Sequence, residues 1–132
     1  MILADTNVLL DIVTDDLAWA DWAQHHLDGA KLRDRLAIND AVYAELSVRY
    51  ARMEDLDAML AAAGIAIEPI PKPALFLAGK AFERYRKRGG TRTGMLPDFF
   101  IGAHAVVADA PLITRDTGRY RSYFPDIRLI SP

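Results

Sequence analysis

The sequence predicts an α/β fold with a mostly parallel sheet. Short β-prone apolar runs alternate with longer segments of helical periodicity along the chain. The 132 residues suit one domain, and 52% hydrophobic with 26% charged residues is typical of a globular protein. We therefore expect residues 1–132 to form a single domain without fibrous or disordered segments.

Five short apolar runs are predicted strands, because they are rich in aliphatic residues and bounded by polar, Gly or Pro residues. They are Ile2–Ala4, Leu36–Ile38, Ile65–Ile70, Leu112–Thr114 and Arg128–Ile130. If the first and fourth of these strands are neighbours near the centre of the sheet, the residues that follow them emerge side by side.

Helices are predicted where apolar residues recur at helical spacing between capping residues. The predicted ranges are Leu17–Ala30, Ala41–Ala51, Glu54–Ala63, Ala74–Arg88 and Asp98–Ala108. Asp15 or Asp16 is expected to cap the first helix and Gly29 to lie near its end, while Gly94 belongs to a predicted loop. The last helix is apolar all round apart from His104, so we expect it to be buried between the sheet and another layer.

Several classes of protein are excluded or disfavoured. The longest unbroken apolar run, Ala58–Ile67, is too short to cross a bilayer, which takes about 20 residues. The first residues lack the basic region of a signal peptide. Without cysteine there are no disulfides, thiolate metal sites or cysteine nucleophiles. We expect a cytoplasmic protein that neither spans nor anchors in a membrane.

Charge is distributed unevenly along the chain. Sixteen basic and 18 acidic residues give a net charge of −2. One segment without any acid nevertheless holds five cations, and the rest of the chain therefore carries −7. These five residues are Arg84, Arg86, Lys87, Arg88 and Arg92. Such a segment is either a solvated helix face or a contact for a polyanion.

Four carboxylates lie at positions where a second role is plausible. Asp5 and Asp116 each follow a predicted strand, at the end where parallel sheets place their ligands. Asp98 opens the apolar helix. The alternative for each is a local one, a helix cap for Asp5 and Asp98 and a turn residue for Asp116.

Glu45 has Ala41, Val42 and Val48 at three- and four-residue spacing, which predicts that it lies on an apolar helix face. A buried carboxylate needs a partner. A salt bridge to Arg49 is the simplest one, but it leaves the inward placement of Glu45 unexplained.

Four carboxylates in one crevice repel one another unless they bind cations. Oxygen ligands without His or Cys favour Mg²⁺ or Mn²⁺, and such ions support hydrolysis of phosphodiesters by activated water. A haloacid-dehalogenase-like phosphatase also has an aspartate after its first strand, but it requires a second one two residues later, where this chain has Asn7.

Four sequence blocks together resemble the PIN-domain ribonucleases, specifically the VapC-like toxins of type II toxin-antitoxin pairs. In order, the blocks are Asp5-Thr6-Asn7-Val8-Leu9-Leu10, Ala44-Glu45-Leu46, Leu96-Pro97-Asp98-Phe99-Phe100-Ile101-Gly102-Ala103-His104-Ala105, and Leu112-Ile113-Thr114-Arg115-Asp116. The resemblance covers nearly the whole chain. Phe99-Phe100 and Gly102 depart from it, since relatives often have smaller residues and Ala there, which affects packing rather than the acids.

The resemblance implies a three-layer α/β/α sandwich and a crevice that binds Mg²⁺ or Mn²⁺. By resemblance, Asp5 and Asp98 are the principal metal ligands, Glu45 is a third acid, and Asp116 is a fourth that helps to place the metal or water. Thr6, Asn7 and Thr114 flank these acids and are candidates to orient a carboxylate or water.

The family further implies an RNA substrate, a homodimer and a cognate antitoxin protein that covers the crevice. On this interpretation the cations of the Arg84–Arg92 segment contact RNA phosphates, or alternatively acidic groups of the antitoxin. A catalytically inert PIN-like module that only binds RNA or protein is the main alternative function. His104, Trp19 and Trp22 are expected to have packing or subunit-contact roles.

Overall fold

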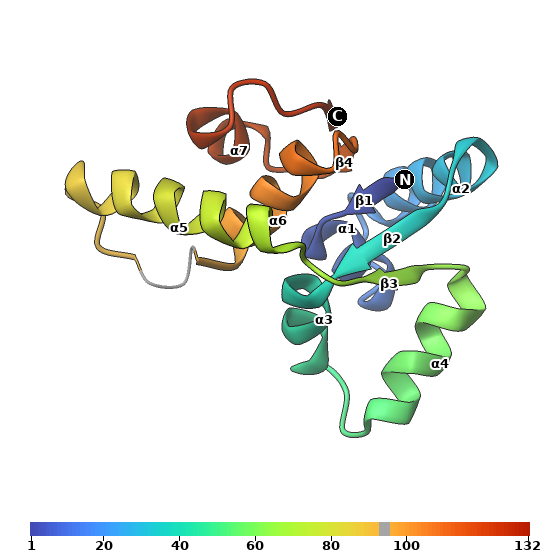
Figure 1. Cartoon of the computed structure of the whole chain (residues 1–132). Helices are drawn as coiled ribbons and strands as arrows, with labels where there is room; N and C mark the ends of the chain where they lie inside the picture. Colours follow the sequence, from blue (N-terminus) through green and yellow to red (C-terminus); the bar gives the residue numbers. More distant parts are fainter. Residues whose placement is uncertain (93–95) are drawn as a thin grey trace.

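The computed structural model describes residues 1–92 and 96–132. Within these ranges five strands form one parallel sheet in the order β3-β2-β1-β4-β5 (Figure 1). The strands are β1 (Ile2–Ala4), β2 (Leu36–Asn39), β3 (Ala66–Glu68), β4 (Leu112–Ile113) and β5 (Leu129–Ile130). The predicted pairing of the first and fourth strands is confirmed, with Leu3 opposite Leu112.

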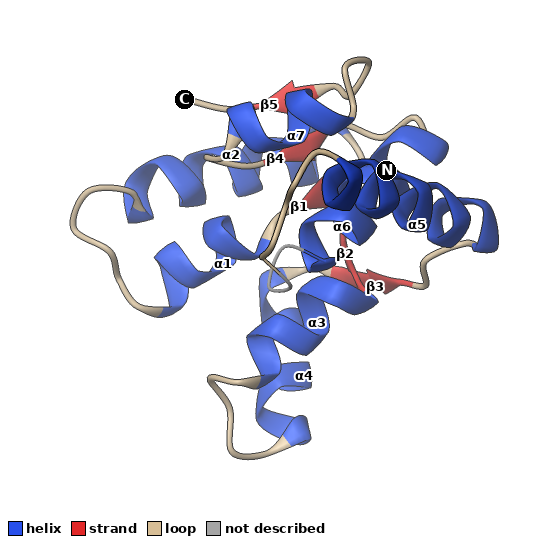
Figure 2. Ribbon diagram, turned by 90° about the vertical axis from the view of Figure 1, so that its left-hand side faces the viewer, coloured by secondary structure: helices blue, strands red, loops and turns tan. Residues whose placement is uncertain are grey.

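Helices cover both faces of this sheet. They are α1 (Thr6–Val13), α2 (Ala20–Arg33), α3 (Asp40–Ser47), α4 (Met53–Ala63), α5 (Lys72–Lys87), α6 (Leu96–Val107) and α7 (Thr117–Tyr123). In Figure 2, α1 and α2 lie on one face and α5 and α6 on the other. The architecture is therefore the predicted α/β/α sandwich.

The order of the strands determines where a ligand site can form. From β1 the chain moves to β2 and β3 on one side, then crosses to β4 and β5 on the other. In open parallel sheets, ligands bind at the carboxyl ends of the strands where the order reverses. Here that position lies between β1 and β4, so it is flanked by Asp5 and Thr114.

The core is formed by the central strands and the helices packed on them. All residues of β1, β2 and β4 are buried, as expected for a sheet covered on both faces. His104 is buried in α6 with its Nδ1 3.2 Å from Asn39 Nδ2, and burial lowers its pKa. The expected packing role of His104 is consistent with this position.

Two predicted helices differ in their bounds from the structure more than the other predicted helices do. The first begins at Ala20 instead of Leu17, because Asp16 Oδ1 accepts bonds from the amides of Ala18 and Trp19 and so forms a turn before the helix. It continues through Gly29 to Arg33. The helix predicted over Ala41–Ala51 begins at Asp40 and ends at Ser47.

The sheet edges and α6 also differ from the prediction. The strand predicted over Ile65–Ile70 is limited to Ala66–Glu68, at the edge of the sheet. Helix α6 begins at Leu96, so Asp98 lies in its first turn and does not open it. Gly94, predicted in a loop, is outside the described residues. No described helix combines the length and the apolar character that crossing a bilayer requires.

Candidate functional site

The four acids singled out in the sequence line one cavity of about 190 Å³ at the carboxyl ends of β1 and β4. Asp5 follows β1, Glu45 comes from α3, Asp98 from α6, and Asp116 precedes α7. The remaining lining residues are Thr6, Asn7, Leu10 and Arg119. Residues from four distant parts of the sequence thus meet at the position that the strand order favours.

Asp5 lies at the bottom of this cavity, only 4% exposed. Its Oδ1 accepts the Thr6 amide at 2.7 Å, so it also caps α1, as the local alternative expected. Its Oδ2 accepts the hydroxyl of Thr114 at 2.7 Å and the side-chain amide of Asn7 at 3.3 Å. These bonds fix the orientation of the carboxylate.

Glu45 is half-buried and is held by α1. The Thr6 hydroxyl donates to Glu45 Oε1 at 2.7 Å, and the structure shows no Glu45–Arg49 ion pair among the described residues. The predicted apolar face is wrong in one respect, since Val48 follows the end of α3 and is 86% exposed. Glu45 faces the cavity rather than the core.

Asp98 and Asp116 share one cation. Arg119 Nη1 lies 2.5 Å from Asp98 Oδ2, and Arg119 Nε lies 3.2 Å from Asp116 Oδ2. The amide of Asp116 donates to the Thr114 hydroxyl at 3.0 Å, which ties the start of α7 to the end of β4. The same hydroxyl bonds Asp5, so the two strand ends are linked through one threonine.

Burial and mutual repulsion favour the protonated forms of these acids. Burial, the dominant cause, raises the pKa of Asp5 to about 6, and the Asp98 charge adds to this effect. Burial also raises the pKa of Glu45 and of Asp98, although Arg119 opposes the increase at Asp98. A cluster with raised carboxyl pKa values in a cleft is typical of a functional site.

The four carboxylates, together with hydroxyl and amide oxygens, fit the chemistry of a hard divalent cation. Their arrangement does not yet form a metal centre: within residues 1–92 and 96–132, no three Asp, Glu or His side chains are positioned to hold an ion as they stand. Arg119 forms ion pairs with two of the four acids, Asp98 and Asp116. The oxygen ligands thus suit a divalent cation, while the guanidinium of Arg119 contacts two of the carboxylates that would bind it.

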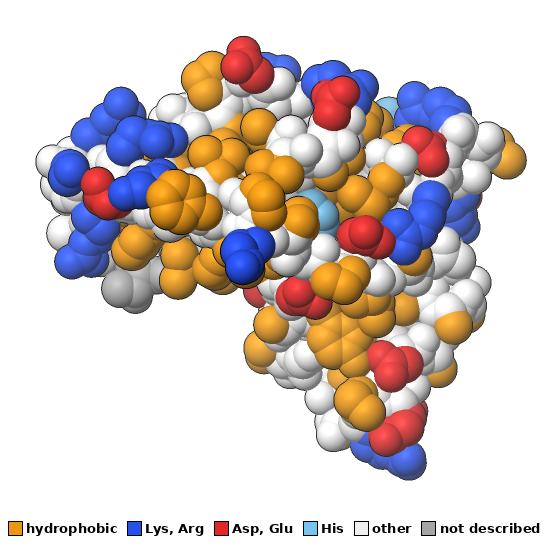
Figure 3. Space-filling view, viewed as in Figure 1, with side chains coloured by type: hydrophobic (Ala, Val, Ile, Leu, Met, Phe, Trp, Pro, Cys, Tyr) orange, Lys and Arg blue, Asp and Glu red, His pale blue; other side chains and the backbone are white. Residues whose placement is uncertain are grey.

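The structure also places the other predicted site residues. Thr6 and Asn7 line the cavity, and Thr114 is buried behind Asp5. The five cations Arg84, Arg86, Lys87, Arg88 and Arg92 do not line it. Most of them occupy the last turns of α5, which project away from the sheet, and Figure 3 shows Lys and Arg side chains gathered at that end.

Sequence reasoning missed two residues of the site, Arg119 and Tyr120. Tyr120 is buried behind Asp5. Its hydroxyl makes no hydrogen bond of normal geometry with the described residues. The hydroxyl nevertheless lies near Asp5 and counteracts the rise in the pKa of that carboxyl. Burial raises the pKa of Tyr120 itself well above its ordinary value. Only the three-residue spacing of Asp116 and Arg119 hinted at this cluster.

Asp11 is buried within α1. Arg115 holds it through two bonds of 2.7 and 2.9 Å, and the guanidinium of Arg115 also lies 5.0 Å from the ring centroid of Trp19. Trp19 in turn packs edge-on against Trp22, and both are half-buried. Arg115 therefore joins the β4–α7 connection to α1 and α2.

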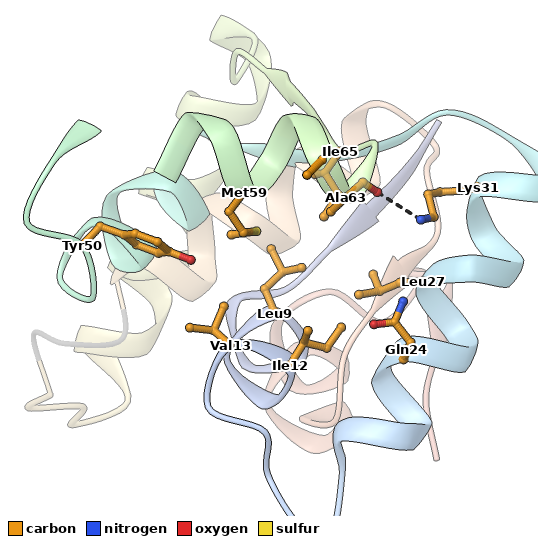
Figure 4. Close-up of a pocket in the computed structure, with 11 residues that line it drawn as sticks. Leu9, Ile12, Val13, Gln24, Leu27, Lys31, Tyr50, Met59, Ala63 and Ile65 are labelled. Atoms are coloured by element: carbon orange, nitrogen blue, oxygen red, sulfur yellow. Dashed lines mark hydrogen bonds between the residues drawn. The ribbon is translucent and has the colours of Figure 1, made fainter. Parts of the chain in front are cut away.

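A second, mostly apolar groove of about 480 Å³ lies away from the four acids and is larger than the acidic cavity (Figure 4). Leu9, Ile12 and Val13 of α1 form one wall, and residues of α2 and α4 form the others. Lys31 crosses one end, where its Nζ donates to the Ala63 carbonyl at 3.1 Å. Helix α1 therefore separates the groove from the acidic cavity.

Comparison with known proteins agrees with this architecture. Residues 2–124 match the PIN domain family. The chain belongs to the PIN domain family. No curated protein sequence matches it.

Solved structures extend the PIN-domain likeness over nearly the full chain. VapBC2 of Rickettsia felis, bound to a promoter DNA fragment, has a TM-score of 0.74 and 20% identity, covering 99% of this chain and 98% of that one. A toxin-antitoxin complex from Klebsiella pneumoniae gives 0.70 and 21%, covering 98% and 96%. FitAcB of Neisseria gonorrhoeae gives 0.67 and 20%, again covering 98% and 96%. At such identities the likeness establishes the PIN fold.

Proposed function

We propose that this PIN-domain protein is a Mg²⁺- or Mn²⁺-dependent endoribonuclease, the toxin of a type II toxin-antitoxin pair, and that residues 1–132 act as a single domain. The observation that carries the proposal is the convergence of Asp5, Glu45, Asp98 and Asp116 on one cavity at the switch point of the sheet. Family membership supports nuclease chemistry, and the toxin-antitoxin neighbours support the toxin role.

In this proposal the four carboxylates hold one or two divalent ions. When bound, the cation supplies positive charge that stabilises the phosphoryl group and favours in-line attack by water. Thr114 and Asn7 orient Asp5 through their bonds to its Oδ2. Thr6 engages Glu45 Oε1, which leaves the other carboxylate oxygen for a cation or for a proton from the attacking water.

The basic end of α5 is proposed to contact RNA phosphates outside the cavity. Its cations are solvent-exposed, and they stand apart from the acids that would repel RNA. Acidic groups of the antitoxin are the alternative partner for this surface. An RNA-binding measurement, described below, separates these roles.

Two further parts of the proposal concern partners. We expect a cognate antitoxin that inhibits cleavage, because the neighbouring structures include VapBC and a further toxin-antitoxin complex. We also expect a homodimer, which the resemblance to VapC-like toxins implies. Expression of the chain alone should arrest growth, and co-expression of the antitoxin should restore it. Growth unaffected by the chain alone would contradict the toxin role.

The central test is cleavage of a structured RNA pool by the purified protein, with Mg²⁺ or Mn²⁺ and with a chelator. We expect cuts leaving 5′-phosphate and 3′-hydroxyl ends, abolished by the chelator and by Asp5→Asn or Asp98→Asn. Asp21→Asn, on the exposed first turn of α2, is the matched control and should cleave normally.

Two results would contradict the proposal. Full cleavage by both site variants would remove the acids from the mechanism. A folded wild-type protein that binds RNA but does not cut it with either ion would favour the catalytically inert module instead.

A further inference from the structure

Arg119 is the only cation among the described residues that lines the acidic cavity. Its guanidinium bridges two of the four carboxylates, 2.5 Å from Asp98 Oδ2 through Nη1 and 3.2 Å from Asp116 Oδ2 through Nε. Asp98 comes from α6, whereas Asp116 and Arg119 come from the start of α7 and its first turns. The arginine therefore occupies the place of a counter-ion between elements of the site.

A divalent ion and this guanidinium compete for the same oxygens. Each lone pair of Asp98 Oδ2 that faces Arg119 is unavailable for coordination, and two cations in contact with the same carboxylates repel each other. Binding of one must weaken binding of the other by the same factor, since such coupling is reciprocal. In the structure, Arg119 contacts the Oδ2 atoms of both Asp98 and Asp116.

The attachment of Arg119 allows it to be displaced. Its side chain is 38% exposed at the mouth of the cavity, and solvent screening weakens an ion pair at such a position. Arg115 is a useful contrast, because its two bonds reach the buried Asp11 and its guanidinium lies over Trp19. Of these two arginines beside the site, Arg119 is the one that can move at low cost.

We propose that Arg119 is a built-in competitor of the divalent ion. Metal binding and release of its guanidinium from Asp98 and Asp116 form a single exchange. The released guanidinium then faces the mouth of the cavity, where it binds a phosphate oxygen of the substrate, a group that the planar guanidinium binds well. The exchange depends only on the chain's own residues, whereas the phosphate step rests on the proposed function.

The first test measures Mn²⁺ binding to the metal-free protein by isothermal titration calorimetry, without RNA. We expect Arg119→Gln to bind Mn²⁺ about tenfold more tightly than the wild type, within the usual range of coupling between sites, and Arg119→Lys to lie between them. Arg121→Gln is the control, because Arg121 is exposed on the same helix and does not line the cavity. Its Mn²⁺ affinity should match that of the wild type.

Thermal unfolding gives an independent reading of the same exchange. Saturating Mn²⁺ should raise the Tm of Arg119→Gln by more than it raises the Tm of the wild type, since ligand stabilisation grows with affinity. If Arg119→Gln does not fold without metal, Arg119→Lys provides the comparison. Mn²⁺ affinity in these variants equal to or below that of the wild type would overturn the exchange.

The second test uses 5′-AMP as a probe for the phosphate step. Wild-type protein with Mg²⁺ should bind 5′-AMP, and Arg119→Gln should bind it severalfold more weakly despite its stronger hold on the metal. Equal 5′-AMP affinity would remove the phosphate role. The two proposals can fail separately. If the wild type cleaves RNA with metal but Arg119→Gln binds Mn²⁺ no more tightly than the wild type, only this inference is wrong. If Arg119→Gln binds Mn²⁺ more tightly but the wild type does not cleave RNA, only the proposed function is wrong.

Discussion

Burial strongly disfavours the charged form of Asp5. It is nearly inaccessible to water, and burial raises its pKa from 3.8 to about 6. A folded-state pKa above the unfolded value means that the folded protein binds the proton more tightly. The contribution of Asp5 to stability is therefore complete below about pH 4 and is lost as the pH rises through 6.

Asp5→Asn should consequently stabilise the metal-free protein at pH 7.5. The expected gain in the free energy of unfolding is up to about 3 kcal/mol, because one pKa unit corresponds to about 1.4 kcal/mol. The gain should shrink as the pH falls toward 4, because the wild-type carboxyl is then protonated in the folded state and increasingly protonated in the unfolded state. Urea unfolding in chelator at pH 7.5 and pH 4.5 measures it.

Asp21→Asn again serves as the control and should change stability little at either pH. An equal effect of Asp5→Asn at both pH values would show that burial does not penalise the Asp5 charge.

Sequence reasoning identified the acids better than the residues that hold them. Asp5 and Asp116 were recognisable because each directly follows an apolar run that forms a buried strand. Arg119 and Tyr120 were not, because their roles depend on a short helix after Asp116 that turns both side chains toward residues of distant segments. Such a contact leaves no periodic signal in the sequence.

At the scale of elements, α6 packs against the middle of α7 and against Phe124, the residue that follows it. Gly102 makes this close approach possible, since a Cβ at this position would lie 2.5 Å from Phe124 Cε2 and 3.1 Å from Tyr120 Cδ1. Two aromatic rings thus fill the space that an alanine would need. The close packing of these rings explains why Gly102 is present where relatives often have Ala.

Gly102→Ala should therefore destabilise the protein by about 1–3 kcal/mol, the usual cost of overpacking a core. Gly79→Ala is the matched control, because its Cβ would meet nothing within 4 Å in the middle of α5. Gly79→Ala should increase the free energy of unfolding by at most about 1 kcal/mol, because alanine has the higher helix propensity. Urea unfolding distinguishes them, and a Gly102→Ala protein as stable as the wild type would contradict the close packing.

Long periodic segments were predicted well, and their ends less well. The strand Ile2–Ala4 follows from its apolar run, and the strand predicted over Leu36–Ile38 extends by one residue to Asn39. Helix α4 ends before Gly64, which takes the left-handed conformation. The start of α2 did not follow, because Asp16 is a good capping residue that instead stabilises a turn one step earlier. Local hydrogen bonds of this kind compete with the helix and are decided by the surrounding packing.

At the scale of the whole molecule, charge separates into a basic end of α5 and a more acidic remainder. Five cations lie between Arg84 and Arg92, while the rest of the chain carries a net charge of −7. If the proposed RNA substrate binds, the carboxylates of the acidic cavity repel its phosphates until cations are bound, so we expect the first contacts to form elsewhere. The end of α5 that projects from the sheet in Figure 1 is suited to that role.

Arg88→Glu should weaken RNA binding and flatten its dependence on salt, reducing the slope of log affinity against log salt by about 1. Arg33→Glu makes the same change in net charge at the end of α2 and is the control. Fluorescence anisotropy with labelled RNA in increasing KCl measures both. An unchanged slope for Arg88→Glu would exclude this surface from RNA binding and leave the antitoxin as its partner.

Pairing of β1 with β4 joins residues that are far apart in the sequence, with Ala4 opposite Ile113. During synthesis, therefore, the sheet that brings Asp5 next to Asp116 forms only after all residues between these two have left the ribosome. For the proposed ribonuclease, a product that stops before Asp116 lacks a complete set of acids. The proposed activity thus requires synthesis to pass Asp116 before RNA can be damaged.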